Sequence, residues 1–353
     1  MGAKISASWD VGCLTGCEHC SVLARRRYRS PRLSRDEDIP NAASAKKDQI
    51  EVDHQYPNKL YFLPYLYPMQ YKEFHWTNDN GNKIYACEWP VANPRAVVGL
   101  IHGLGEHVHR YDGLAERFAA ADVAVVGYDR QGFGRSEGRR GYAAQFREFL
   151  DEIARLLLAC ENRYPDLPVF LYGHSMGGQL LLRYLIRRKP DISGAIVSAP
   201  HIRTSFRPNP VIVGLGKVMR SVMPTFAQNN QLDLSQLSRN PAIAPAYAAD
   251  PLVHQRLTSQ TGIDMLEAAR HLDQYADGVE IPTLLMHGGK DGITDPEASR
   301  EFAARNPDQL TFKSWPGLYH ELHHEPEREE VFAFVLSWME DHMEAVNRWP
   351  KSV

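Results

Sequence analysis

The sequence predicts an α/β protein in which helices cover both faces of a mostly parallel, eight-stranded sheet, with a helical segment inserted between two strands. Short, nearly continuous apolar runs alternate with amphipathic helical patterns, which is typical of parallel strands buried on both sides. The chain has 353 residues, enough for one domain of about 250 residues with additions. From about residue 200 to residue 270 the alternation stops, which indicates the insertion.

The expected strands begin with a hairpin. An Asn80-Gly81 turn joins its two halves, and both halves contain the aromatic and β-branched residues that strands favour. Six apolar runs follow and supply the remaining strands. The eight expected strands are Glu73–Thr77, Ile84–Trp89, Ala96–Ile101, Val123–Tyr128, Val169–Tyr172, Gly194–Ser198, Thr283–Met286 and Gln309–Ser314.

Helices are expected between these strands. In the clearest pattern, apolar residues from Phe146 to Cys160 share one face, and the pattern stops at Pro165. Another helix, Gln179–Arg188, follows the fifth strand. We therefore expect residues 70–199 and 271–353 to form the core, residues 200–270 to form a helical cap without strands, and residues 1–69 to form a weakly ordered extension.

Composition narrows the class of protein. A formal net charge of -3 argues against a nucleic-acid partner, because such proteins normally carry a basic excess. The sequence contains no apolar run of the roughly 18 residues that span a bilayer, and the N-terminus lacks a secretory apolar core. We expect a cytoplasmic protein that can associate peripherally with a membrane. Cys87 and Cys160 are expected to be buried, reduced packing residues.

Three further cysteines lie near the N-terminus. Cys13, Cys17 and Cys20 have the spacing of cluster ligands in radical S-adenosylmethionine enzymes, and with His19 they could instead hold zinc. Neither a matching barrel nor a fourth-ligand context accompanies them. We therefore expect no metal and no cofactor.

The candidate nucleophile is Ser175. It is the centre of Gly173–Gly177, a Gly-His-Ser-Met-Gly sequence between an apolar strand and a helical pattern. A sharp strand-to-helix turn exposes the hydroxyl at the helix N-terminus, where unpaired N–H groups favour a developing negative charge. This context predicts a serine hydrolase.

A serine nucleophile needs a base, and the base needs an orienting carboxylate. Asp291 follows the strand Thr283–Met286 and is the expected acid, while Asp295 resembles a helix N-cap because Pro296 follows it. The base is expected after the last strand. His320 is our choice there, and His323 is the alternative.

Two backbone amides are expected to stabilise the tetrahedral oxyanion. One belongs to Met176, directly after the nucleophile, and the other to Leu104 in the glycine-containing loop His102–His107. Glycines on both sides of Leu104 allow the loop to expose that amide.

These motifs together resemble the monoacylglycerol lipases and lysophospholipases of the α/β-hydrolase superfamily. The resemblance extends over about residues 70–342. The matching segments are His102–His107, Asp129–Gly138, Gly173–Gly178, Ser198–Pro200, Leu237–Asn240, Asp250–Leu252 and the loops of Asp291 and His320.

The resemblance implies an α/β-hydrolase fold and specific roles. Ser175, Asp291 and His320 would be the triad, which favours His320 over His323 as base. Leu104 and Met176 would supply the oxyanion donors. Polar contacts to the glycerol side of the substrate would come from Glu106, Arg110 and His323.

The expected activity is cofactor-independent hydrolysis of a monoacylglycerol or similar single-chain lipid ester. Apolar cap residues would line an acyl tunnel and make transient contact with membranes or lipid aggregates. The tunnel residues we select are Ile212, Leu215 and Met219. A lysophospholipase, a thioesterase or a peptidase could use the same triad. A catalytically silent binding protein is disfavoured because competent residues occupy every expected catalytic position.

Overall fold

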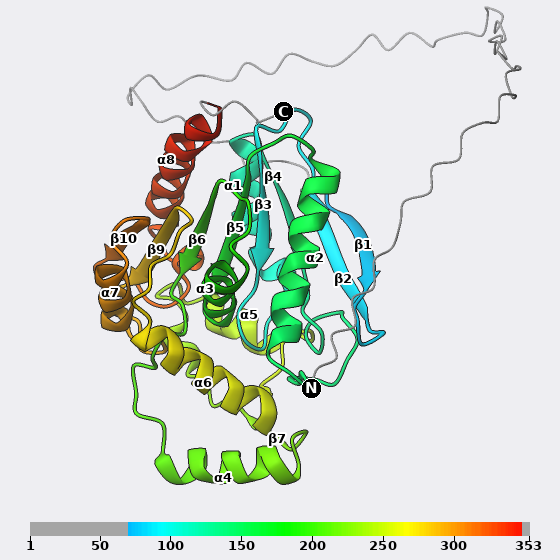
Figure 1. Ribbon diagram of the computed structural model, residues 1–353, viewed down its shortest axis with the longest axis vertical. Coiled ribbons are helices and arrows are strands. Elements are labelled where there is room, and N and C mark those ends of the chain that lie inside the picture. The colour runs from blue at the N-terminus through cyan, green and yellow to red at the C-terminus, as the bar shows by residue number, and fades with distance from the viewer. Residues whose placement is uncertain (1–69, 348–353) are drawn as a thin grey trace, which may run out of the picture. The chain divides into compact units, whose positions relative to one another are not determined.

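The computed structural model of the protein describes residues 70–347, with side-chain surroundings through Met343 (Figure 1). The expected extension over residues 1–69 and the cysteines Cys13, Cys17 and Cys20 lie outside these residues. Cys87 and Cys160 are both fully buried free thiols, as predicted.

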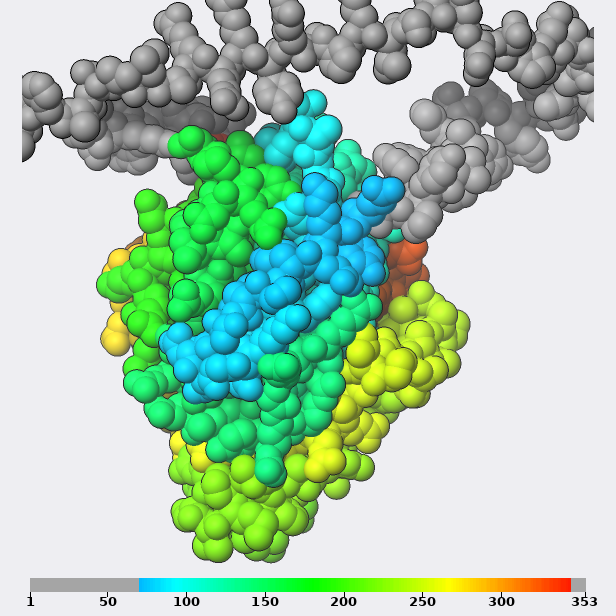
Figure 2. All heavy atoms as spheres, turned by 90° about the vertical axis from the view of Figure 1, so that its right-hand side faces the viewer, coloured from blue at the N-terminus to red at the C-terminus, as the bar shows by residue number. Residues whose placement is uncertain are grey.

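The core is one eight-stranded sheet, and the predicted fold class is confirmed. Its spatial order is β1-β2-β4-β3-β5-β6-β9-β10. The β1–β2 and β2–β4 pairs are antiparallel and every other pair is parallel. Figure 2 shows the β1–β2 hairpin, in blue, on the molecular surface at this edge of the sheet. The strands are Lys72–Thr77 (β1), Lys83–Trp89 (β2), Ala96–Ile101 (β3), Val123–Tyr128 (β4), Val169–His174 (β5), Gly194–Ser198 (β6), Thr283–Gly288 (β9) and Leu310–Trp315 (β10).

Helices cover both faces because each presents an apolar stripe to the sheet. One face packs against α1 (Asp112–Ala120) and α8 (Arg328–Asn347). The other packs against α2 (Arg147–Arg163), α3 (Met176–Arg188) and α7 (Pro296–Arg305). The stripe predicted from Phe146 to Cys160 corresponds to α2, whose residues Phe149, Ile153, Leu156 and Cys160 are completely buried.

The parallel strands determine where functional side chains can gather. Because β3, β5, β9 and β10 run in the same direction, the loops that follow them emerge at one edge of the sheet. Those four loops carry Leu104, Ser175, Asp291 and His320. The sheet therefore brings together residues that are up to 216 positions apart in the sequence.

The segment between β6 and β9 forms the insertion. Its helices are α4 (Pro210–Val222), α5 (Ile243–Ala249) and α6 (Ser259–Gln274), with a short 3₁₀ turn, η2 (Leu234–Gln236). The expectation that it contains no strand was wrong, because β7 (Ala227–Asn229) pairs antiparallel with β8 (Arg256–Thr258). Each of these strands has only three residues, too few to show an alternating pattern in the sequence.

Helix α4 packs on α6 and buries none of its own side chains (Figure 1). Arg220 of α4 forms ion pairs with Asp264 and Glu267 of α6, at 3.1 and 2.8 Å. Most of its apolar residues consequently remain in contact with solvent. Among the helices of residues 70–347, none is both long enough and apolar enough to cross a bilayer.

The connection from β5 into α3 depends on two glycines. A Cβ atom at Gly177 would lie 2.2 Å from the Ile101 carbonyl oxygen, and one at Gly173 would lie 2.6 Å from the Gly177 carbonyl oxygen. Both distances are far below van der Waals contact. The glycines of the Gly-x-Ser-x-Gly sequence are therefore required for the close approach of α3 to β3 and β5.

Candidate active site

Ser175 occupies a strained turn between β5 and α3. Its φ of 54° and ψ of -116° lie in a region that non-glycine residues rarely adopt, which costs about 1–3 kcal/mol. Backbone hydrogen bonds to neighbouring residues maintain the turn. Ser175 N–H donates to the Ser198 carbonyl at 3.0 Å, and its carbonyl accepts from His201 N–H at 3.1 Å and Gln179 N–H at 2.9 Å. The side chain is thereby presented at the start of α3.

Asp291 and His320 form a short buried contact in which His320 Nδ1 lies 2.6 Å from Asp291 Oδ2. The loops after β9 and β10 supply these two side chains. Asp291 Oδ1 accepts from the backbone N–H groups of Ile293 and Thr294, at 2.7 and 3.0 Å. Its Oδ2 also accepts from the Thr294 hydroxyl at 2.8 Å and from His287 Nε2 at 3.0 Å. The carboxylate is therefore fixed from several sides.

The contact shifts the pKa values of both groups in the directions that a base and its orienting acid require. Burial would raise the pKa of Asp291, but charged His320 and the hydrogen bonds from His287 and His320 hold this pKa well below its usual range. Burial would lower the pKa of His320, but the Asp291 carboxylate outweighs burial and raises the pKa above its ordinary value. Asp291 is therefore ionised at neutral pH.

His320 lies close to the turn that carries Ser175. Its ring centroid is 4.7 Å from that of His174, the residue directly before Ser175. His174 and His201 are buried near His320, and burial followed by repulsion from His320 lowers the pKa of each to about 4. Both rings are consequently neutral at physiological pH, whereas the pKa of His320, which contacts His174, is raised.

The two alternatives considered for the acid and the base have different surroundings. Asp295 caps α7, with its side chain accepting from Glu297 N–H, as its sequence context predicts. His323 stacks on Tyr111 at 4.7 Å, and among the described residues neither of its ring nitrogens has a hydrogen-bond partner. The contact with Asp291 is made by His320.

The loop after β3 lies against Ser175. A Cβ atom at Gly103 would be 3.4 Å from Ser175 Cβ. Leu104 follows in this loop, and Met176 is the first residue of α3. Within residues 70–347, neither the Leu104 nor the Met176 N–H has an acceptor. Two unpaired amides therefore lie on the segments that flank Ser175.

Glu106, Arg110 and Glu321 form a buried ionic network beside these loops. Arg110 Nε donates to Glu106 Oε2 at 2.8 Å, and its terminal nitrogen donates to both oxygens of Glu321 at 2.6 and 2.7 Å. Glu106 Oε1 also accepts from Gly103 N–H at 2.5 Å and from the Tyr111 hydroxyl at 2.6 Å. The network therefore joins the Leu104 loop to the residue directly after His320. Two of the residues expected on the glycerol side, Glu106 and Arg110, take part in it.

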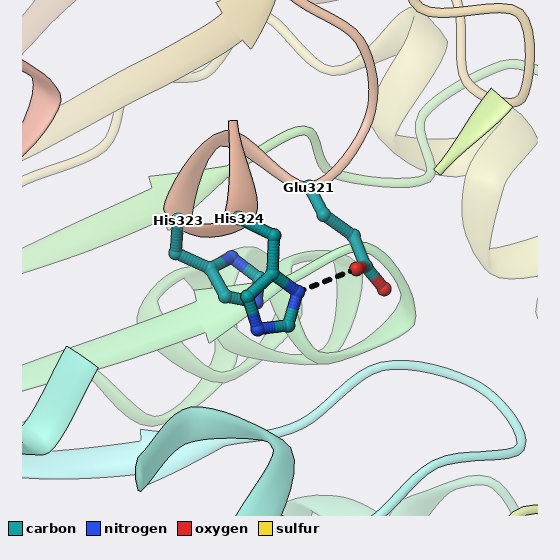
Figure 3. Close-up of side chains that lie close together, drawn as sticks. All are labelled: Glu321, His323 and His324. Carbon is teal, nitrogen blue, oxygen red and sulfur yellow. Dashed lines mark hydrogen bonds and ion pairs between the residues drawn. The ribbon is translucent and has the colours of Figure 1, made fainter. Parts of the chain in front are cut away.

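Glu321, His323 and His324 form the one group among the described residues whose ligand atoms could reach a common metal ion, within 4.8 Å of one another. Figure 3 shows His324 directed at Glu321, and their Nδ1–Oε2 distance is 2.7 Å. Arg110 already donates to both Glu321 oxygens, and His324 Nε2 lies 3.1 Å from the Arg110 carbonyl oxygen. The ligand atoms of Glu321 and His324 are thus already occupied in the ionic network, whereas those of His323 have no partner among the described residues.

The residues expected to line an acyl tunnel all lie on α4. Ile212 and Leu215 are exposed, at 45% and 60%, and Met219 is half-buried. The arrangement of α4 therefore directs two of the three toward solvent, and their assignment to the substrate stays a prediction.

Several residues around the site were not selected from the sequence. His287 and Thr294 hold Asp291, Glu321 pairs with Arg110, and Arg130 contacts the loop after β3. One signal was available for Arg130, since it lies only two residues after the end of a buried strand, where a charged side chain is unusual. Nothing in the local sequence distinguishes Glu321 from a surface glutamate.

The sheet order and the strained serine turn together define the class of α/β-hydrolase serine hydrolases. The serine aminopeptidase S33 family matches residues 92–327. The chain belongs to this family, and it is an enzyme of the serine esterase and lipase kind.

Individual relatives extend the comparison. A monoacylglycerol lipase of Mycolicibacterium smegmatis is 34% identical over 262 residues, which are 74% of this chain and 93% of the relative. An uncharacterised abhydrolase domain-containing protein of Dictyostelium discoideum is also 34% identical, over 74% of this chain but only 28% of its own length. The crystal structure of a Paleococcus ferrophilus monoacylglycerol lipase aligns with a TM-score of 0.66 and 31% identity, covering 73% of this chain and 99% of that one.

The electrostatics of His320 can be tested with Asp291→Asn. Removing the carboxylate charge leaves burial as the dominant influence, so the pKa of His320 is expected to fall from above 6.5 to below 6.5. Titration of ¹⁵N-histidine-labelled protein by NMR measures this value. The control, Asp295→Asn, removes a carboxylate from the helix cap and should leave the pKa of His320 above 6.5. A His320 pKa that is unchanged in Asp291→Asn would contradict the account.

Proposed function

We propose that the enzyme hydrolyses single-chain lipid esters, with monoacylglycerols as its principal substrates. The proposal rests first on the 2.6 Å contact between Asp291 and His320 beside the strained Ser175 turn. Family membership supports the reaction class. The names of the Mycolicibacterium and Paleococcus relatives support the choice of monoacylglycerol as the leading substrate.

In the proposed mechanism the Ser175 hydroxyl attacks the ester carbonyl. His320 accepts the hydroxyl proton as a bond forms between Ser175 Oγ and the carbonyl carbon, and it returns that proton to the departing alcohol. Water then attacks the acyl-enzyme, again with His320 as base, and releases the fatty acid. Asp291 stays ionised throughout, because its pKa lies well below the usual range, and stabilises the imidazolium.

The Leu104 and Met176 amides would stabilise the oxyanion of each tetrahedral intermediate. Two observations support this role: neither amide has an acceptor within the described residues, and Gly103 lies against Ser175. Met176 N–H also begins α3, where the helix dipole favours negative charge. Losing one such donor typically slows acyl transfer by about 10²–10³-fold.

Peptide-bond hydrolysis is the competing function, because the family is described as a serine aminopeptidase and the triad does not determine the leaving group. A substrate panel separates the two. Under the proposal, 1-monooleoylglycerol has a higher kcat/KM than oleoyl lysophosphatidylcholine, oleoyl-coenzyme A or leucine 4-nitroanilide. A panel in which the aminoacyl anilide is the best substrate would instead assign the peptidase activity.

The nucleophile can be tested with Ser175→Ala. Because the hydroxyl forms the covalent bond, p-nitrophenyl butyrate turnover is expected to fall by about 10⁴–10⁶-fold without loss of folded protein. A fluorophosphonate probe should label the wild type and leave this variant unlabelled. The control, Ser221→Ala, changes an exposed serine of α4 and should retain both rate and labelling. Wild-type turnover by Ser175→Ala would refute the mechanism.

A second part of the proposal is that the insertion rests on lipid aggregates. Residues 70–343 contain ten large apolar side chains that are exposed, and eight of them cluster between residues 206 and 226. Such a concentration of exposed apolar side chains on and beside α4 favours contact with a membrane surface. The eight residues are Phe206, Val211, Ile212, Leu215, Val218, Val222, Met223 and Phe226.

Membrane contact can be tested with the double variant Val211→Ser and Val222→Ser. These side chains are 75% and 72% exposed, and their loss should weaken binding to phosphatidylcholine vesicles by about tenfold in sedimentation assays. Turnover of soluble p-nitrophenyl acetate should not change. Leu158→Ser removes a 46% exposed apolar side chain from α2 and serves as the matched control. Equal vesicle binding by the wild type and the double variant would exclude this surface.

A further inference from the structure

Arg130 is a completely buried cation behind the candidate active site. It is the second residue after β4, and its side chain is among the largest fully buried ones. No carboxylate of the described residues lies within ion-pair distance of its guanidinium group. Instead it lies over the rings of Phe133 and Phe149, at 5.1 and 5.9 Å. A buried charge without a counter-ion is strongly disfavoured, so its retention calls for an explanation beyond packing.

The guanidinium group donates to the loop that carries Leu104. One terminal nitrogen donates to the His102 carbonyl oxygen and the other to the Gly103 carbonyl oxygen. His102 Nδ1 lies 2.8 Å from the same Gly103 oxygen, and His102 Nε2 accepts from Arg130 N–H at 3.0 Å. Burial and the Arg130 charge hold the pKa of His102 well below its usual value, so this ring is neutral and donates through Nδ1. Two donors therefore fix one carbonyl.

That carbonyl belongs to the peptide group whose N–H is the Leu104 amide. Because the peptide is planar and trans, its C=O and N–H groups point in opposite directions. Holding the Gly103 oxygen toward Arg130 therefore directs the Leu104 N–H away from Arg130. A charged donor on the oxygen also polarises the peptide and strengthens the N–H as a donor.

The same guanidinium group also approaches the side chain of the residue that carries the second amide donor. A terminal nitrogen of Arg130 lies 4.0 Å from Met176 Sδ, on the residue that carries the other unpaired N–H. The positive charge is thus adjacent to both segments from which an oxyanion would be stabilised, in surroundings with little solvent to screen it.

We propose that Arg130 is a positioning residue that orients and polarises the Leu104 peptide, so that its amide is ready to receive the oxyanion before substrate binds. This inference rests on the proposed function, because it assumes that Leu104 N–H is an oxyanion donor. Arg130 touches no reacting atom. Its contribution is to transition-state stabilisation and leaves ground-state binding unaffected.

The test compares Arg130→Ala and Arg130→Lys with the wild type, using p-nitrophenyl butyrate. Arg130→Ala is expected to lower kcat by about 10–100-fold with KM within about twofold, because the donor is mispositioned rather than removed. Arg130→Lys retains the charge, but an ammonium group lacks the planar pair of terminal nitrogens that donates to both carbonyls. Its kcat should therefore be intermediate. Affinity for an aryl trifluoromethyl ketone, which forms a tetrahedral adduct, should fall in parallel with kcat/KM.

Chemical rescue and a matched control distinguish positioning from a general structural effect. Low millimolar guanidinium should restore much of the kcat of Arg130→Ala, by occupying the vacated space and donating to the two carbonyls. Arg163→Ala is the control, because Arg163 also packs on an aromatic ring, that of Phe74, but lies outside the site. Its kcat and trifluoromethyl ketone affinity should match the wild type.

The proposal is wrong if a folded Arg130 variant keeps kcat within twofold of the wild type, or if kcat falls while trifluoromethyl ketone affinity does not. It is also wrong if neither variant folds, because Arg130 would then be a folding residue. Fluorophosphonate labelling keeps these outcomes separate from a failure of the proposed function. If wild-type Ser175 is not labelled, the serine mechanism fails, whatever the Arg130 variants do.

Discussion

The ionic contacts of Arg110 are the constraint on which the arrangement of the site depends. Arg110 lies between Glu106 and Glu321, and the three side chains are only 7%, 3% and 2% exposed. Glu106 also accepts a hydrogen bond from Gly103 N–H, and Glu321 directly follows His320 in the sequence. The loop with the candidate oxyanion donor and the loop with the candidate base are therefore tied to one cation. Removing the Arg110 cation or one of the two glutamate anions would leave a buried ion without its partner, which typically costs about 3–5 kcal/mol. The network therefore strongly favours one relative placement of the two loops.

The site combines strain with rigid support. Ser175 adopts unfavourable backbone angles, and its backbone N–H and C=O groups are bonded to Ser198, Gln179 and His201. Asp291 receives five hydrogen bonds, from three side chains and two backbone amides. Arg130 and His102 fix the Gly103 carbonyl in the same manner. Apart from His320, the neighbours that hold these groups do not themselves react in the proposed mechanism, and this support reduces the reorganisation needed during the reaction.

The sequence was most informative where the relevant pattern is local. Strand positions in the sheet were predicted to within one or two residues, because buried parallel strands are apolar along their whole length. Helix α3 begins at Met176, three residues before the predicted start, because Gly177 and Gly178 carry no apolar pattern. The three-residue strands β7 and β8 were missed for lack of length. The contacts of Glu106, Arg110 and Glu321 were not predictable, since a charged residue in a loop is normally solvated and only the tertiary fold reveals the burial of these three.

A crystal structure of the enzyme after reaction with a long-chain alkyl fluorophosphonate would test the central claim most directly. The account predicts a covalent bond from Ser175 Oγ to phosphorus, with the phosphoryl oxygen about 2.7–3.1 Å from the N–H nitrogens of both Leu104 and Met176. It also predicts that His320 remains bonded to Asp291 and directs its other ring nitrogen toward the adduct. A phosphoryl oxygen that faces away from both amides, or an adduct on another residue, would contradict the convergence of these loops into one catalytic site.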